Sequence, residues 1–206
     1  MPNTQTELRR LLQERLDHPE QTHDIDRQIH ALFDRDCAIL VLDLSGFSRL
    51  TVRYGIVHFL AMIHRMAAIA SPIVQQHQGQ VIKQEADNLF AIFAQVDQAV
   101  AAAIAIFQAF AVANATLPQD QDLYASIGIG YGTMLVVDNQ DLFGNEMNLA
   151  SKLGEDLARQ GEILLTEAAY HHLHPTPHPQ PDTRHWEPLP LIISGLEIQA
   201  YKWLGT

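Results

Sequence analysis

Apolar residues recur at three- and four-residue steps along the first 34 residues, which is the spacing of an amphipathic helix. The pair His18-Pro19 interrupts this spacing and divides it into two helices. We therefore predict a helical extension over residues 1–34, and a lever, a dimer contact and a cap on the core are the roles open to it. The apolar positions are Leu8, Leu11, Leu12, Leu16, Ile25, Ile29, Leu32 and Phe33.

The pattern changes at Cys37, where an unbroken apolar run leads to Asp43 and predicts a strand buried on both faces. Later segments alternate between helical and extended patterns. We expect helices near 57–76, after Asp97 and over 145–158, strands at 81–84, 89–93, 124–130, 134–137, 162–165, 191–194 and 197–203, and a loop over 171–190. The order strand–helix–strand–strand–helix–strand predicts an α+β fold with a ferredoxin-like split βαβ core in one domain, residues 35–206.

Charge and composition narrow the functions that such a domain can have. The formal net charge of −11 argues against a nucleic-acid partner, whose phosphates need clustered Lys and Arg, and against electrostatic attachment to a membrane. No apolar stretch reaches the roughly 20 residues of a membrane helix, and the polar start has no signal-peptide core. Cys37 is the only cysteine, so no intrachain disulfide forms. We expect a cytoplasmic protein.

Two aspartates come at the ends of predicted strands. Asp43 is followed by Ser-Gly and a helix, whose N-terminal N–H groups suit phosphate oxygens, and Asp87 lies in the tight connection between two short strands. Taken singly, an aspartate before a helix is more often a helix N-cap, and one between two short strands is more often an ordinary turn residue. The split βαβ order brings them together, however, and two adjacent carboxylates repel unless a cation lies between them. The pair predicts a site for Mg²⁺ or Mn²⁺.

A third candidate is the segment from Asp141 to Lys152. Wound as a helix from Asn145, it places Asn145, Asn148 and Lys152 on one face, while Leu149, Leu153 and Leu157 form an apolar stripe on another. The stripe would anchor the helix and leave amides and a cation projecting from the chain. A solvated polar face is the alternative interpretation.

Four segments, in this order, resemble the catalytic domains of class III adenylyl and guanylyl cyclases, and the similarity extends from about Ala38 to Leu204. They are Leu-Asp-Leu-Ser-Gly-Phe-Ser (42–48), Lys-Gln-Glu-Ala-Asp (83–87), Ser-Ile-Gly-Ile-Gly-Tyr-Gly (126–132) and Asp-Leu-Phe-Gly-Asn-Glu-Met-Asn-Leu-Ala-Ser-Lys (141–152).

The resemblance implies a role for each matching position. Asp43 and Asp87 would bind two Mg²⁺ or Mn²⁺ ions. Lys83 and Asp141 would read the adenine ring, which favours ATP over GTP, and Asn148 would orient the ribose. Lys152 would face the α-phosphate. The triphosphate would lie along Leu44, Ser45, Gly46 and Phe47.

In the family the active site forms across a homodimer. Asp43 and Asp87 would then face the partner's Lys83, Asn148 and Lys152, and the reaction would yield 3′,5′-cyclic AMP and pyrophosphate. A separate regulatory protein, a small ligand such as bicarbonate or the N-terminal helices would supply regulation.

Three departures from the family bear on activity. Lys152 replaces the usual Arg, Ser194 replaces a lysine that grips the β- and γ-phosphates, and the arm over 133–140 is short. A cyclase homologue that binds nucleotide without turning it over is therefore the first alternative. The second is a diguanylate-cyclase relative, although Glu85-Ala-Asp-Asn-Leu stands in place of that family's Gly-Gly-Asp/Glu-Glu-Phe turn.

Overall fold

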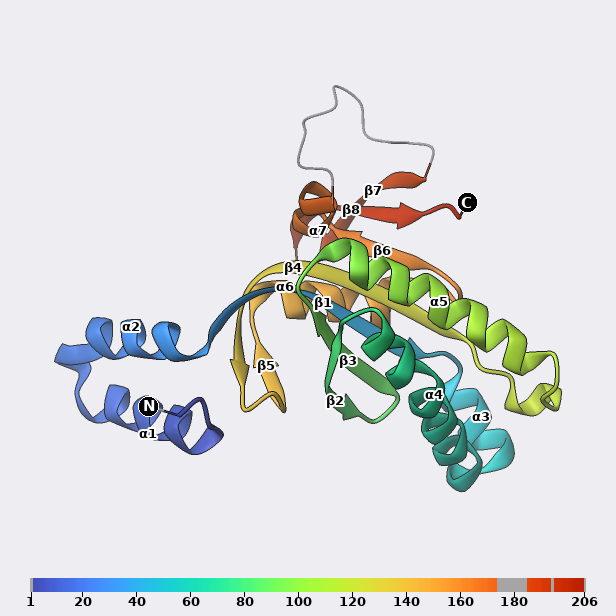
Figure 1. Cartoon of the computed structure of the whole chain (residues 1–206), viewed down its shortest axis with the longest axis horizontal. Helices are drawn as coiled ribbons and strands as arrows, with labels where there is room; N and C mark the ends of the chain where they lie inside the picture. Colours follow the sequence, from blue (N-terminus) through green and yellow to red (C-terminus); the bar gives the residue numbers. More distant parts are fainter. Residues whose placement is uncertain (1, 174–184, 194, 206) are drawn as a thin grey trace.

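The computed structural model describes residues 2–173, 185–193 and 195–205, without the side chains of 47–49, 193 and 196. Its main body is an eight-stranded sheet with helices on both faces, and a helical hairpin extends from one end (Figure 1). The elements are α1 Gln5–Asp17, η1 Pro19–Gln21, α2 Thr22–Phe33, β1 Asp34–Leu44, α3 Phe47–Tyr54, α4 Ile56–Gln76, β2 Gln80–Glu85, β3 Asn88–Phe93, α5 Val96–Asn114, η2 Gln119–Gln121, β4 Ala125–Val137, β5 Asp141–Phe143, α6 Asn145–Ser151, η3 Lys152–Leu157, β6 Ile163–Thr166, α7 Glu167–Leu173, β7 Trp186–Ile193 and β8 Leu196–Trp203.

The sheet has the strand order β2-β3-β1-β4-β6-β8-β7, and β5 pairs with β4 outside this path. Strand β1 lies antiparallel between β3 and β4, and β4 and β6 run parallel. The unit β1–α4–β2–β3–α5–β4, in the spatial order β2-β3-β1-β4, is the ferredoxin-like split βαβ that the sequence pattern predicts. The predicted α+β fold is confirmed.

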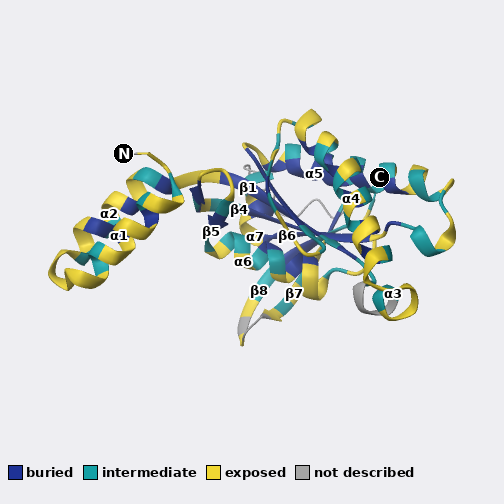
Figure 2. Ribbon diagram, turned by 90° about the horizontal axis from the view of Figure 1, so that it is seen from below, coloured by how far each residue is buried: buried dark blue, intermediate teal, exposed yellow. Residues whose placement is uncertain are grey.

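Strand β1 is buried on both faces because a helical layer covers each of them. Even-numbered residues such as Leu40 and Leu42 pack in the main core beneath α4 and α5. Odd-numbered residues such as Ile39 and Val41 pack on the opposite side with Ala150 of α6. Figure 2 shows this buried centre of the sheet between partly exposed helices. The alternation places Asp43 on the α6 side.

Glycines of β4 let α6 lie directly on the sheet. Gly128, Gly130 and Gly132 alternate along β4 and therefore share one face. A Cβ atom on Gly128 would lie 2.0 Å from the carbonyl oxygen of Ala150, and one on Gly130 would lie 2.7 Å from the carbonyl oxygen of Glu146. Backbone contact thus explains Gly128 and Gly130, where no larger residue fits, whereas a Cβ atom on Gly132 would meet only the side chain of Glu146.

Several elements differ from the sequence predictions. The segments expected at 124–130 and 134–137 form one strand, β4, and the helix expected over 145–158 changes to a π-helix, η3, at Lys152. The expected loop over 171–190 begins within α7, which buries Ala169 and Tyr170, and ends within β7. Helix α3 is short because Gly46 and Gly55, with φ of 98° and 87°, bound it in conformations that favour glycine.

The N-terminal helices form a hairpin, as the break at His18-Pro19 predicts. Pro19 begins η1, and α1 and α2 pack against each other through buried leucines and isoleucines. The hairpin also contacts the end of β4, where Val137 is buried in the same cluster. The assignment of residues 1–34 as an extension separate from the domain stays a prediction.

Helices α4 and α5 are long and apolar enough to span a membrane by length and composition alone, which the sequence analysis did not expect. Core helices of globular domains meet the same criterion. Both helices pack on the sheet, α4 through Phe59, Met62 and Met66, and α5 through Ile106 and Phe110.

The contact between β4 and α6 gives a first prediction. We expect Gly128→Ala to lower the melting temperature by roughly 5–10 °C, because the new methyl group pushes against backbone that cannot rotate away. Gly132→Ala is the matched control: its Cβ would meet only the side chain of Glu146, so the loss should be smaller. Equal melting temperatures for the two variants, measured by thermal unfolding, would contradict this account.

Candidate functional site

The structure brings the two predicted metal aspartates together. Asp43, at the end of β1, is paired across the ladder with Asn88 of β3, and Asp87 directly precedes Asn88. The Leu44 N–H donates a hydrogen bond of 3.2 Å to the Asp87 carbonyl, which joins the two strand ends. The carboxylates therefore lie at one edge of the sheet, on adjacent strands.

Electrostatic strain accumulates on Asp43. Burial raises the pKa of its carboxyl group to about 7, and the negative charges of Asp87, Glu155 and Asp156 add to the rise. A raised carboxyl pKa means that the protein does not compensate the charge of the ionised form. A hard divalent cation bound by oxygen ligands would compensate it, so the residues fit Mg²⁺ or Mn²⁺.

The aspartates do not make a complete coordination shell by themselves. Among the residues that the structure describes, no three His, Cys, Asp or Glu side chains converge on one metal position. Mg²⁺ commonly takes one or two carboxylates and completes its shell with water and substrate phosphate. Asp43 and Asp87 match that arrangement.

The segment predicted to follow the triphosphate, residues 44–47, has part of its backbone already engaged. The Ser45 N–H donates to the Tyr124 carbonyl at 2.7 Å, the Leu44 N–H is bonded to Asp87, and the Leu44 side chain is buried in the core. Gly46 makes the turn into α3, and no described side chain caps the first turn of that helix. The groups left for a phosphate are the Gly46 N–H and those of the first turn, beginning at Phe47.

The predicted base-reading residues meet directly, although 58 positions separate them in the sequence. The Lys83 ammonium donates hydrogen bonds to Asp141 at 2.8 Å and to Glu85 at 2.9 Å, and it lies 5.1 Å from the ring centroid of Phe90. Burial alone would lower the pKa of Lys83, but the two carboxylates outweigh it and raise that pKa. Asp141 reaches Lys83 because the β4–β5 hairpin carries it towards β2.

An open cavity of about 600 Å³ lies between the β2–β3 hairpin and α6. Asn145, Asn148 and Lys152 all line it, so the polar face predicted for this helix is turned towards one space. The other lining residues are Glu85, Asn88, Phe90, Met147, Leu149, Ser151, Glu155 and Ile198.

The apolar stripe predicted for the same helix is wrong in two of its three positions. Leu153 is buried, but Leu149 lines the cavity and Leu157 is exposed. Ala150 and Leu153 anchor the helix instead, because the glycines of β4 accept Ala150 at backbone distance. The π-helix from Lys152 onward then changes the angular spacing that an α-helical projection assumes.

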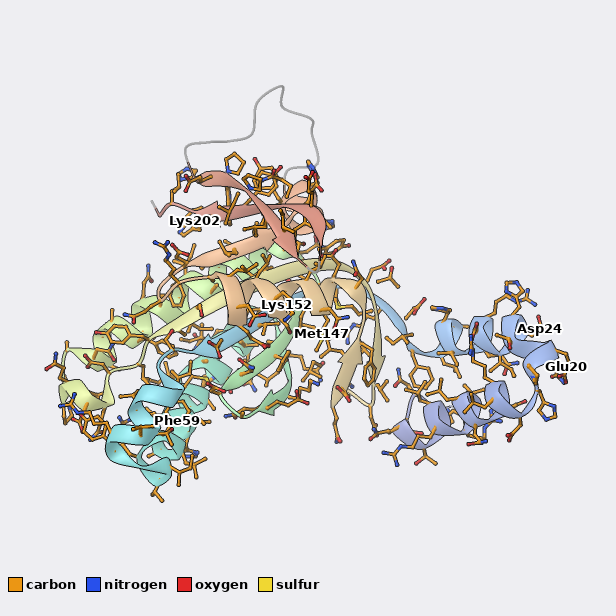
Figure 3. All side chains as sticks on the ribbon, turned by 180° about the vertical axis from the view of Figure 1, so that it is seen from behind. Glu20, Asp24, Phe59, Met147, Lys152 and Lys202 are labelled. Atoms are coloured by element: carbon orange, nitrogen blue, oxygen red, sulfur yellow. The ribbon has the colours of Figure 1, made fainter. Side chains whose placement is uncertain are left out.

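The lysines that could contact phosphate are engaged within the chain. Lys152 donates to Asp156 at 2.6 Å, and Lys202 pairs with Glu162 at 2.8 Å. Lys202 lies on β8 of the C-terminal hairpin, apart from Met147 of α6 and Lys152 at the start of η3 (Figure 3). Ser194 lies outside the described residues.

Sequence reasoning missed Glu146, which holds α6 in place. Its carboxylate accepts hydrogen bonds from the Tyr131 N–H at 3.2 Å and from the Thr166 hydroxyl at 2.6 Å. The β4–β6 ladder ends at Ile129, so Glu146 supplies the acceptor for the next outward N–H of β4. An acidic residue within a polar helical face gave no signal for this role. The sequence likewise contained no signal for Glu155 and Asp156, whose negative charges raise the pKa of Asp43.

Comparison with known proteins identifies the family. The model of the adenylate and guanylate cyclase catalytic domain matches residues 31–191, more than three quarters of the chain. The chain belongs to this family. The resemblance inferred from the four motifs is thereby confirmed, and the chain is a class III cyclase catalytic domain. Most of the N-terminal hairpin lies outside the matched range.

Two curated relatives carry adenylate cyclase names. "Putative adenylate cyclase 3" of Rhizobium meliloti (strain 1021) is 34% identical over 140 residues, which are 68% of this chain and 24% of that protein. "Adenylate cyclase" of Streptomyces coelicolor (strain ATCC BAA-471 / A3(2) / M145) is 29% identical over 138 residues, 66% of this chain and 34% of that protein. The chain thus spans about a quarter to a third of the length of these relatives.

A solved structure shares the fold over nearly its whole length. The adenylate/guanylate cyclase/hydrolase from Silicibacter pomeroyi superposes with a TM-score of 0.68 at 25% identity, covering 84% of this chain and 98% of that one. The cyclase catalytic domain is therefore most of what the structure contains.

The strain on Asp43 predicts a pH-dependent stability in the presence of a chelator. Between about pH 4 and pH 7 the folded chain keeps a proton on Asp43 that the unfolded chain has released, so this group's contribution to stability falls as pH rises. Asp43→Asn should remove that loss. Because solvent screens a partly buried carboxylate, we expect a gain of about 1 kcal/mol at pH 8, or 2–4 °C in melting temperature, and little gain at pH 4.

Asp138→Asn, at an exposed position in the β4–β5 turn, is the control and should not change the pH profile. Adding Mn²⁺ should raise the melting temperature of the wild type and not that of Asp43→Asn. An Asp43→Asn variant that is less stable than the wild type at pH 8 would contradict this account.

Proposed function

We propose that this domain is an adenylyl cyclase, which converts ATP to 3′,5′-cyclic AMP and pyrophosphate. The observation that carries the proposal is the meeting of Lys83 and Asp141 on the sheet face that also carries Asp43 and the α6 cavity. These residues supply the two halves of a nucleotide site: a charged pair for a base and a pair of carboxylates for cation-bound phosphates.

The Lys83–Asp141 pair favours adenine by its hydrogen-bonding groups. An ammonium donates to a ring nitrogen, and a carboxylate accepts from the exocyclic amine. Both side chains are largely shielded, with 15% of the Lys83 side chain and 29% of the Asp141 side chain exposed. A base that inserts between them would replace their ion pair by hydrogen bonds to the base, in the same partly buried surroundings. We propose ATP as the substrate and GTP as a poorer one.

In the proposed reaction the ribose 3′-hydroxyl attacks the α-phosphorus, a new O3′–P bond forms, and the bond to the β-phosphate oxygen breaks. Pyrophosphate leaves, and the hydroxyl proton passes to water. Divalent ions held by Asp43 and Asp87 would supply the positive charge that acidifies the hydroxyl and neutralises the leaving group. Asn148 would position the ribose, and Lys152 would offset the charge that develops on the α-phosphate.

We propose that two copies of the chain make each site. Lys83 of β2 is paired with Phe90 of β3, and Asp43 of β1 is paired with Asn88 on the other side of β3. Two strand spacings and a two-residue offset therefore separate Lys83 from Asp43 in one chain, roughly 12 Å. The cavity on the α6 side is open, and its wall includes the partly exposed Leu149 and Ile198. A second copy placed there would cover these residues. It would also bring its Asp43 and Asp87 to the Lys83–Asp141 pair of the first chain.

Specific ion pairs favour a second candidate, a domain that binds nucleotide and does not turn it over. All three lysines of the chain are paired with carboxylates, Lys152 with Asp156 among them. A phosphate must compete with Asp156 for Lys152. Such a domain would regulate through nucleotide-dependent dimerisation.

The test is to incubate the purified chain with ATP or GTP and Mn²⁺ or Mg²⁺, and to separate the products by chromatography. We expect cyclic AMP from the wild type and Asp138→Asn, and none from Asp43→Ala or Asp87→Ala. ATP binding that depends on metal, without product, would reject the cyclase and support the second candidate. Product from GTP alone would reject the base assignment.

Lys152 gives a prediction of rate. Lys152→Arg should raise kcat on the order of tenfold, because a planar guanidinium can donate two hydrogen bonds to a phosphate. Lys202→Arg is the matched control, since its partner Glu162 lies elsewhere, and it should leave kcat unchanged. A kcat for Lys152→Arg equal to that of the wild type would contradict a role for Lys152 at the α-phosphate.

A further inference from the structure

The N-terminal hairpin is joined to the strand pair that carries Asp141. The Asn3 side chain donates to the Val136 carbonyl at 2.9 Å and to the Leu32 carbonyl at 3.2 Å, and its oxygen accepts from the Asp138 N–H at 2.9 Å. One carboxamide thus connects the last turn of α2, strand β4 and the turn between β4 and β5.

A small apolar core strengthens this connection. Val137, at the end of β4, is buried in a cluster with five residues of α1 and α2, and Leu135 packs against its edge. The five residues are Leu8, Leu11, Ile25, Ile29 and Phe33. This cluster is separate from the cores of the sheet, so the α1–α2 hairpin holds the β4–β5 hairpin through contacts of its own.

The opposite side of the β4–β5 hairpin packs against the sheet. Val136 and Leu142 are buried with Phe90 and Ile82 against the sheet, and Asp141 reaches Lys83 at 2.8 Å. Asp141 is also the cross-strand neighbour of Val137. The hairpin that carries Asp141 is therefore held from both sides, by the sheet and by the N-terminal helices.

We propose that the α1–α2 hairpin is a clamp that positions Asp141 for base recognition, and that Asn3 is a positioning residue of this clamp. The inference rests on the proposed function for the role of Asp141. Strand β5 has only three residues and pairs with β4 alone, so its ladder is too short to fix a side chain by itself. A signal that shifts the N-terminal helices would then change nucleotide selection without touching the nucleotide.

Two variants of the full chain loosen the clamp at different points. Asn3→Ala removes the carboxamide, and Gln13→Ala, which removes an exposed amide that donates to Asp17 within α1, is its control. Leu11→Ala leaves a cavity in the apolar cluster, and Leu16→Ala, on the exposed side of the same helix, is its control. None of these residues lines the cavity of the site.

We expect amide hydrogen exchange over residues 141–143 to become about 5- to 10-fold faster in Asn3→Ala, the effect of losing roughly 1 kcal/mol of local stability, and faster still in Leu11→Ala. The KM for ATP should rise several-fold and the preference for ATP over GTP should fall, while kcat at saturating ATP stays near the wild-type value. The two controls should behave as the wild type.

Unchanged exchange over 141–143 in Leu11→Ala would overturn the clamp, as would faster exchange with an unchanged preference for ATP over GTP. A wild type that makes no cyclic nucleotide would instead overturn the proposed function. The clamp is then tested by hydrogen exchange over 141–143 and by the affinities for ATP and GTP, measured by calorimetry with Mn²⁺. If the clamp is correct, Asn3→Ala must both speed the exchange and change the ratio of the two affinities.

Discussion

The close contact between the backbones of β4 and α6 is the constraint on which the site depends. At Gly128 the chain leaves no room for a side chain, so Ala150 lies against the strand and fixes the height of α6 above the sheet. Glu146 fixes the other end of the helix through Tyr131 and Thr166. With both ends set, Asn148 and Lys152 project into the cavity on the same side as Asp43. The positions of the side chains that line the cavity therefore depend on how closely α6 packs on β4.

Electrostatics explains why such an acidic chain can serve a polyanionic ligand. The net charge is −11, and each of the three lysines is already paired with a carboxylate. Attraction for a triphosphate can then come from the N–H groups at the start of α3 and from cations that the chain concentrates. Asp43, with its pKa raised by burial and by neighbouring carboxylates, is a group that such a cation would stabilise. In the proposed function, selection of the base takes place separately, at the shielded Lys83–Asp141 pair.

Periodicity and motif order were enough to predict the split βαβ core, because each strand and long helix has an apolar pattern that matches its burial. Asp43 and Asp87 could be placed together for the same reason: strand order sets which ends are neighbours. Features that depend on a few contacts could not be predicted. The π-helix from Lys152 onward changes the direction in which Leu157 points, and the bonds of Asn3 and Glu146 join segments far apart in sequence without any local pattern.

The account joins one chain's carboxylates to a partner's base-reading pair, and mixing two inactive variants tests this most directly. Asp43→Ala lacks a metal carboxylate and Lys83→Ala lacks the base lysine, so each alone should make no cyclic AMP. In a one-to-one mixture that exchanges subunits, half of the dimers carry one intact site, and roughly a quarter of the wild-type activity should return. A mixture as inactive as its components, although the dimers exchange, would contradict a site shared between two chains.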